Sequence, residues 1–266
     1  MTVAKLSVTF TGADNRTLID DLADITDASV KLAVPVEFGL LCSTSRAGDE
    51  RYPSGHAAQH LLRICRGENV PVAVHLCGAA ARAVLSNRCL ELDAFGTQQW
   101  RDVVIEVAST GRVQVNLPRD MSTTENLRAA WRNLQKLVGR AGWPNMGTVI
   151  GQHRDDVWPE PGPDEAPFTE SGDIAWLLDR SGGRGIPLHV SDMPRLPGHP
   201  VGVAGGLGPD DNTQAIARHM LASTHGGWID LETNIRRGGK LDADLCVDVL
   251  RRVALARDDA TSDASV

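Results

Sequence analysis

Eight short runs of apolar and β-branched residues recur along the chain, and stretches with helical periodicity separate most of them. Such runs are typical of buried strands, whereas apolar residues spaced three or four apart predict amphipathic helices. The predicted strands cover residues 5–10, 35–42, 71–77, 112–116, 147–152, 174–179, 200–204 and 228–232. The predicted helices cover 15–26, 56–67, 79–88, 124–140, 211–223 and 241–257. This alternation predicts parallel strands joined by crossover helices.

Eight such strands predict an α/β fold, a single (β/α)8 TIM barrel over residues 1–256. A length of 266 residues fits, because α/β barrels of this size commonly form one domain. Residues 154–173 carry four prolines, so we expect the fifth helix to be missing or replaced by a proline-rich loop. The small polar residues 257–266 predict a disordered C-terminal tail.

The sixth strand has two interpretations when the apolar runs are considered alone. One places it at 174–179, as above. The other places it at the proline-containing run IPLHV, residues 186–190, in which case 174–182 would form a helix.

Composition narrows the class of ligand. A formal net charge of -7 and a pI near 5.6 argue against nucleic-acid binding, which requires a basic surface. No apolar run approaches the roughly 18 residues of a membrane span. Five widely spread cysteines without a C-x-x-C pair predict buried free thiols. The first residues lack a signal-peptide pattern, so we expect a cytoplasmic protein that binds a small molecule.

The predicted strands end in polar and glycine-rich motifs, and the carboxyl ends of the strands carry the chemistry in such barrels. In chain order the motifs are FTGADN at 10–15, DERYPS at 49–54, VQVN at 113–116, LLDRSGGRG at 177–185, GVAGGLGPDDN at 202–212 and IDLETNIR at 229–236. This series resembles the strand-end motifs of the phosphoribosylanthranilate isomerase family. The chain also resembles a divergent subfamily of such barrels with Thr-Gly-Ala-Asp, Arg-Tyr-Pro-Ser and Ser-Gly-Gly-Arg-Gly stretches.

The resemblance places the sixth strand at 174–179 and implies that Asp179 is a general acid, followed by the substrate-binding glycines Gly182 and Gly183. In the family reaction, an acid protonates the ribose ring oxygen while a base removes the C2 proton, which turns an aminoaldose into an aminoketose. Arg51 matches a family arginine that faces the substrate carboxylate. Gly205 and Gly206 match half of a phosphate cup.

The chain departs from the family at the base, because Thr11 stands where the family has a catalytic cysteine. A threonine hydroxyl could orient a substrate but could not remove a carbon-bound proton unaided. His75 and His153, at the ends of two strands, are the candidate bases, since imidazole titrates near neutral pH. Cys42 and Cys77 are weaker candidates.

Strand eight departs too, because Glu232, Thr233 and Asn234 replace a Ser-Ser-Gly turn that completes the family's phosphate cup. A carboxylate beside a phosphate is repulsive by several kcal/mol, at about 4 Å and an effective dielectric of about 20. Glu232 must therefore point away, be offset by Arg236 or Arg237, or exclude a phosphate.

Gln114 and Asn116 are candidate donors to substrate hydroxyls, beside Asn234 and Arg236 as further substrate-binding candidates. The two acidic residues of strand eight, Asp230 and Glu232, leave a neutral or cationic polyol open as the ligand. No histidine–carboxylate spacing supports a metal, and we expect no metal and no cofactor.

Three functions follow as hypotheses. The first is an isomerase-like enzyme that transfers protons by acid/base chemistry on a sugar-derived, phosphorylated or unphosphorylated substrate. The second is a barrel that binds a ligand or a protein without turnover, and the weakest is a lyase or hydrolase acting on a sugar-linked substrate. The oligomeric state stays open, a homodimer included.

Overall fold

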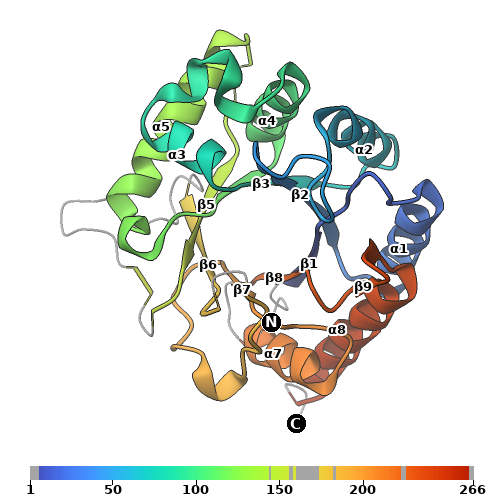
Figure 1. Ribbon diagram of the computed structural model, residues 1–266. Helices are drawn as coiled ribbons and strands as arrows, with labels where there is room; N and C mark the ends of the chain where they lie inside the picture. The colour runs from blue at the N-terminus through green and yellow to red at the C-terminus, as the bar shows by residue number, and fades with distance from the viewer. Residues whose placement is uncertain are drawn as a thin grey trace.

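The computed structural model describes residues 6–143, 145–155, 158–159, 174–181, 184–222 and 226–263. Eight parallel strands form a closed barrel in chain order, and helices surround it (Figure 1). The strands are β1 Leu6–Thr11, β2 Val36–Cys42, β3 Val72–Leu76, β4 Arg112–Val115, β5 Thr148–His153, β6 Ile174–Leu178, β7 Val201–Ala204 and β8 Gly227–Leu231. The predicted α/β barrel and all eight predicted strands are confirmed.

Seven α-helices lie outside the barrel in the described ranges of the chain. They are α1 Ile19–Leu32, α2 Gly55–Gly67, α3 Ala79–Leu85, α4 Gln98–Thr110, α5 Thr124–Arg140, α7 Asp211–Leu221 and α8 Ala243–Asp263. Four of them begin at a polar N-cap whose side chain accepts a backbone N–H: Ser54, Thr97, Thr123 and Asp210. None of the described helices is long and apolar enough to cross a membrane.

The structure decides the sixth strand. Residues 174–178 form β6 and pair with β5 on one side and β7 on the other. The alternative strand at 186–190 is wrong, because this segment is irregular and leads into a 3-10 turn, Val190–Asp192. Pro187 has no N–H to donate, and Leu188 makes one backbone hydrogen bond to Gly205.

Three helices differ from the sequence prediction. Helix α1 begins at Ile19 rather than 15, because Asp14 accepts the Arg16 N–H and holds residues 14–17 in a turn. Helix α4, which was not predicted from the sequence, precedes β4. Helix α8 continues to Asp263, so residues 258–263 are helical rather than a polar tail.

Packing explains the length of α8. Arg257 donates to the carbonyls of Leu32 and Ala33 at the end of α1, and Ala260 packs against the core. The proline-rich replacement of the fifth helix was predicted for residues 154–173, most of which lie outside the described residues.

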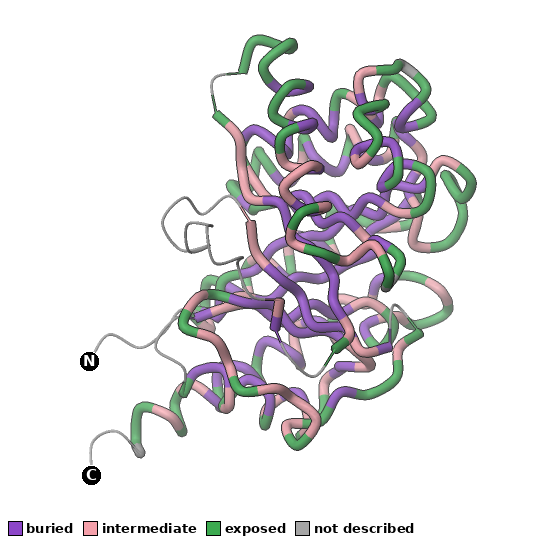
Figure 2. The backbone as a smooth tube through the Cα atoms, turned by 90° about the vertical axis from the view of Figure 1, so that its left-hand side faces the viewer, coloured by how far each residue is buried: buried purple, intermediate pink, exposed green. Residues whose placement is uncertain are grey.

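Burial follows the layers of the fold, with the strands buried and the outer helix faces exposed (Figure 2). Inside the barrel, an ion pair between Arg112 and Glu37 lies toward the amino ends of the strands, and Thr9 bonds to both partners. The Arg112 guanidinium also stacks 4.4 Å from the ring centroid of Trp228. An apolar cluster fills the rest of this region: Ile150, Leu177, Ala204 and Trp228. Together these side chains form the floor of the site described next.

Candidate active site

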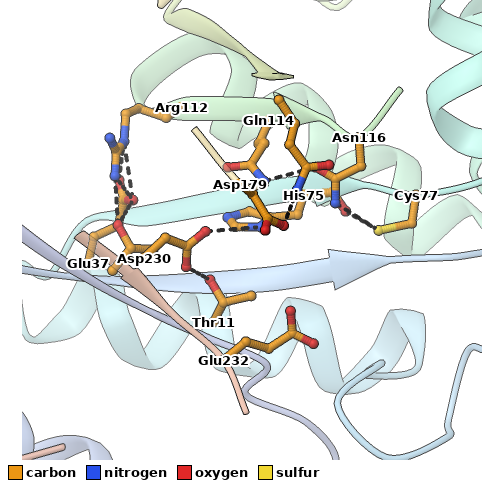
Figure 3. A network of polar contacts seen from close by, with 12 residues as sticks. Thr11, Glu37, His75, Cys77, Arg112, Gln114, Asn116, Asp179, Asp230 and Glu232 are labelled. Carbon is orange, nitrogen blue, oxygen red and sulfur yellow. Dashed lines mark hydrogen bonds and ion pairs between the residues drawn. The ribbon is translucent and has the colours of Figure 1, made fainter. Parts of the chain in front are cut away.

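A cavity of about 400 Å³ opens at the carboxyl ends of the strands. In a strand every second side chain faces the same side, and the strand pairings bring these inward positions together. Five strand-end side chains enter the cavity this way: His75, Gln114, Gln152, Asp179 and Asp230. Figure 3 shows the polar contacts among several of them.

Asp230, on β8, is a buried carboxyl group with an elevated proton affinity. The Thr11 hydroxyl donates to its Oδ1 at 2.6 Å, and His75 Nδ1 lies 3.9 Å from its Oδ2 (Figure 3). Burial raises the pKa of Asp230 to about 8, with nearby Glu232 adding to the rise and the Thr11 hydrogen bond opposing it. At neutral pH the group is therefore mostly protonated.

His75, on β3, is buried beside Asp230 and Thr11. Burial, and then the charge of Arg112, lower the pKa of His75 to about 3. Its imidazole is neutral at pH 7 and is a weak base. Gly39 makes room for it, because a Cβ there would lie 3.1 Å from His75 Nε2 and would clash with the Thr11 hydroxyl.

Asp179, which follows β6, is held by three donors. Gln152 Nε2 donates to its Oδ2 at 2.6 Å, while the backbone N–H and hydroxyl of Ser181 donate to Oδ1 at 3.0 and 2.7 Å. Its own N–H donates to the His153 carbonyl at 2.9 Å, which continues the β5–β6 pairing. These donors occupy both oxygens of the carboxyl group and fix its orientation at the edge of the cavity.

Gln114 on β4 and Asn116 just after its end form a hydrogen-bonded chain with Cys77. Gln114 Nε2 donates to Asn116 Oδ1 at 2.8 Å, and Asn116 Nδ2 donates to Cys77 Sγ at 3.4 Å (Figure 3). All three line the cavity. Burial raises the pKa of Cys77 to about 12 and that of Cys42 well above its ordinary value. Neither cysteine is a thiolate at neutral pH.

Arg51 and Glu232 form an ion pair of 2.7 Å at the cavity wall. The backbone N–H of Arg51 donates to Asp14 Oδ2, and Arg51 adopts a left-handed φ of 72°. Burial raises the pKa of Glu232, and the Arg51 guanidinium opposes that rise. The direct partner of Glu232 is thus Arg51, whereas Arg237 pairs with Asp242 at 3.1 Å.

His153 and Arg236 are not part of the cavity lining. His153 follows the inward-facing Gln152 on β5, so its ring points outward, 4.6 Å from the ring centroid of Trp158. Burial lowers the pKa of His153 to about 4. Arg236 is buried and donates to the carbonyl of Gly12 at 2.6 Å and to Asp14 at 2.7 Å, so it fixes the β1 loop.

The loop after β7 contains Gly205 and Gly206, both with positive φ, of 121° and 57°. A Cβ on Gly206 would lie 2.6 Å from the Gly185 carbonyl oxygen and 2.7 Å from Pro187 N. Asn234 Nδ2 donates to the Gly206 carbonyl at 2.7 Å. The glycine pair therefore allows a turn that packs against the preceding loop, while it also lines the cavity. Gly182 and Gly183 lie outside the described residues.

Sequence reasoning gave Gln152 and Ser181 no role, and it considered Asp230 only, together with Glu232, for the kind of ligand and not for catalysis. Asp230 had a detectable signal, since it shares the facing of Glu232 two residues later in the eighth predicted strand. Gln152 had the same kind of signal, because it ends the fifth predicted strand. Ser181 had none, because its bond to Asp179 depends on the local turn.

The sequence matches no protein-family model and no curated protein. A solved structure with a similar fold is that of N-(5'-phosphoribosyl)anthranilate isomerase from Pyrococcus furiosus. The two chains are 14% identical, with a TM-score of 0.42 over 93% of this chain and 98% of the other. This likeness concerns the fold alone, so a function must be inferred from the geometry of the cavity.

Proposed function

We propose that this protein is an enzyme that transfers protons on a small, sugar-derived molecule, with Asp230 as general acid and Asp179 as general base. The observation that carries the proposal is that two carboxyl groups in contrasting environments line one cavity. Burial raises the pKa of Asp230 to about 8, whereas three donors hold Asp179. The raised pKa supports Asp230 as the proton donor, and the fixed carboxyl group of Asp179 supports its role as the proton acceptor.

The chemistry that suits this pair is enolisation and its reversal. The Asp179 carboxylate takes a proton from a carbon next to a carbonyl or imine, and the C–H electron pair forms a C–C double bond. The carbonyl or imine π electrons move to its oxygen or nitrogen, which receives the proton of Asp230. Asp179 then returns its proton to the former carbonyl or imine carbon, while the hydroxyl on the adjacent carbon gives its proton to Asp230 and becomes the new carbonyl, which completes an isomerisation.

The remaining cavity side chains support this role. Thr11, which lies outside the cavity lining, and the neutral His75 hold the Asp230 carboxyl group, and Gln114 and Asn116 offer amides to substrate hydroxyls. The sequence predicted Asp179 as the acid and a histidine as the base. The low pKa of His75 and the donors around Asp179 support the reversed assignment. A phosphorylated aminoaldose remains one substrate within this proposal.

Solvent-deuterium incorporation across a panel of candidate substrates tests the proposal. Aldoses, ketoses, amino sugars and their phosphate esters are incubated with the protein in D2O, and carbon-bound deuterium is measured by mass spectrometry. We expect incorporation next to the carbonyl of one member. Asp179→Asn and Asp230→Asn should each slow it by about 10²-fold or more. Asp248→Asn, on the exposed face of α8, is the control and should have no effect.

Two results would count against the proposal. Full exchange in Asp179→Asn would remove the assigned base. A panel member that binds in the cavity without any exchange would favour the barrel that binds without turnover.

A further inference from the structure

We infer that Arg82 and Arg154 form a subsite for the phosphate group of the ligand, on the β3–β5 side of the cavity. This inference rests on the proposed function, because it names the class of ligand that the same cavity binds. The ligand is a small polyhydroxylated molecule that carries a phosphate at one end and the reacting carbon at the other.

The topology brings the two arginines to one side of the cavity. Arg82 lies on α3, which follows β3, and Arg154 follows β5 directly. Strand β4 runs between those strands and presents Asn116 to the same cavity. Adjacent strands are about 4.8 Å apart, so β3 and β5 are separated by roughly 10 Å. Because Arg82, Arg154 and Asn116 all line the cavity, a ligand group next to Asn116 would lie on the side of the cavity that both arginines line.

The charges of these arginines are available to a ligand. Within the described part of the chain, neither Arg82 nor Arg154 forms an ion pair. Other arginines in or below the cavity already have partners. Arg51 pairs with Glu232, Arg112 pairs with Glu37, and Arg46 lies 3.6 Å from Asp49 and stacks on Tyr52.

The acidic groups lie on the other side of the cavity. Asp179 follows β6, and Asp230 and Glu232 belong to the end of β8, so they flank the β7 loop with Gly205 and Gly206. A phosphate dianion at that loop would be repelled by the ionised groups there. At Arg82 and Arg154 it would instead receive parallel N–H donors from planar guanidinium groups. The reacting carbon would then extend toward the two aspartates.

Binding of inorganic phosphate tests the subsite. Phosphate is titrated by calorimetry at constant ionic strength into the wild type, Arg82→Gln and Arg154→Gln. We expect each substitution to weaken binding about tenfold, because each removes charge-assisted hydrogen bonds. Arg63→Gln is the matched control, since Arg63 is exposed on α2 outside the cavity lining. The phosphate affinity of Arg63→Gln should equal that of the wild type.

A second variant distinguishes the two sides of the cavity. Thr233→Glu adds a negative charge on the β8 side and should change phosphate affinity less than twofold if the arginines hold the ion. Unchanged affinity in both arginine variants, loss of binding only in Thr233→Glu, or no phosphate binding to the wild type would overturn the inference. Tighter binding of acetate than of phosphate through the same arginines would overturn the phosphate assignment.

The outcome is separable from that of the proposed function. Phosphate binding that depends on Arg82 and Arg154 in a protein without deuterium exchange would support the subsite and contradict the acid/base proposal. Deuterium exchange in a protein whose phosphate affinity is independent of both arginines would support the acid/base proposal and contradict the subsite.

Discussion

Asp230 shows how the barrel interior changes the chemistry of one residue. The carboxyl group lies beside His75, which is neutral at pH 7, and below it the Arg112 charge is already paired with Glu37. Because Asp230 is buried and has no direct cationic partner among the described residues, the protonated form is favoured and the pKa rises to about 8. The Thr11 hydroxyl is the strongest opposing interaction, because it donates to Oδ1.

Removal of that hydroxyl should therefore raise the pKa of Asp230 further. Thr11→Val keeps the side-chain shape but deletes the donor to the ionised carboxylate. We expect the alkaline limb of the pH–rate profile for deuterium exchange to shift upward by roughly 1 pH unit. Thr110→Val, at the exposed end of α4, should leave the profile unchanged. A downward shift in Thr11→Val would show that the hydroxyl does not stabilise the ionised form.

Sequence reasoning reached part of this site. His75, Gln114 and Asn116 could be selected because they lie at the ends of predicted strands, whereas Asp179 and Arg51 were selected through the family resemblance. The role of Asp230 could not be predicted in the same way, because its pKa depends on burial and on partners far away in sequence. Thr11, its hydrogen-bond donor, is separated from it by 219 positions.

Among the elements, the β7 loop is shaped by its contact with the loop after β6. Gly206 has a left-handed φ of 57° and no room for a Cβ beside Gly185 and Pro187. Gly238, in the turn between strands β9 Arg236–Arg237 and β10 Lys240–Leu241, has nearly the same φ, 58°, but open space around it. A comparison of the two glycines therefore distinguishes the effect of backbone strain from the effect of close packing.

Alanine substitution at both positions measures the two effects. Gly238→Ala should cost about 1 kcal/mol of unfolding free energy, because it adds only left-handed strain. Gly206→Ala should cost about 1–3 kcal/mol more, because the new Cβ must displace the 185–187 backbone. Urea unfolding measures both values. Equal costs would show that the β7 loop does not need the close approach.

The elements themselves were largely predictable, and their boundaries less so. The strands of a parallel barrel are buried on both faces and appear in the sequence as apolar runs, so all eight could be located from the sequence. Helix α4 was missed even though Thr97 caps it, and α1 starts later than predicted because the Asp14 turn precedes it. The choice of sixth strand needed the Leu177–Asp179 motif, since IPLHV is equally apolar.

At the scale of the whole molecule, the protonated Asp230 makes the free energy of unfolding depend on pH. Its pKa rises on folding from an ordinary value of 3.8 to about 8. The stability it contributes is fully present below about pH 4 and is lost as the pH rises toward 8. Relative to Asp230→Asn, the wild type should lose about 1.4 kcal/mol per pH unit between about pH 5 and 7. Urea unfolding of both proteins across this range measures the difference, and a constant difference would contradict the linkage.

The proposed chemistry depends on a buried carboxyl group in the cavity that keeps its proton at neutral pH. Carbon-13 NMR of protein labelled at the aspartate carboxyl groups tests this directly, with the Asp230 signal assigned by its absence in Asp230→Asn. We expect a titration midpoint near 8 for that signal. A midpoint near 4, as for an exposed aspartate, would contradict the assignment of Asp230 as the acid.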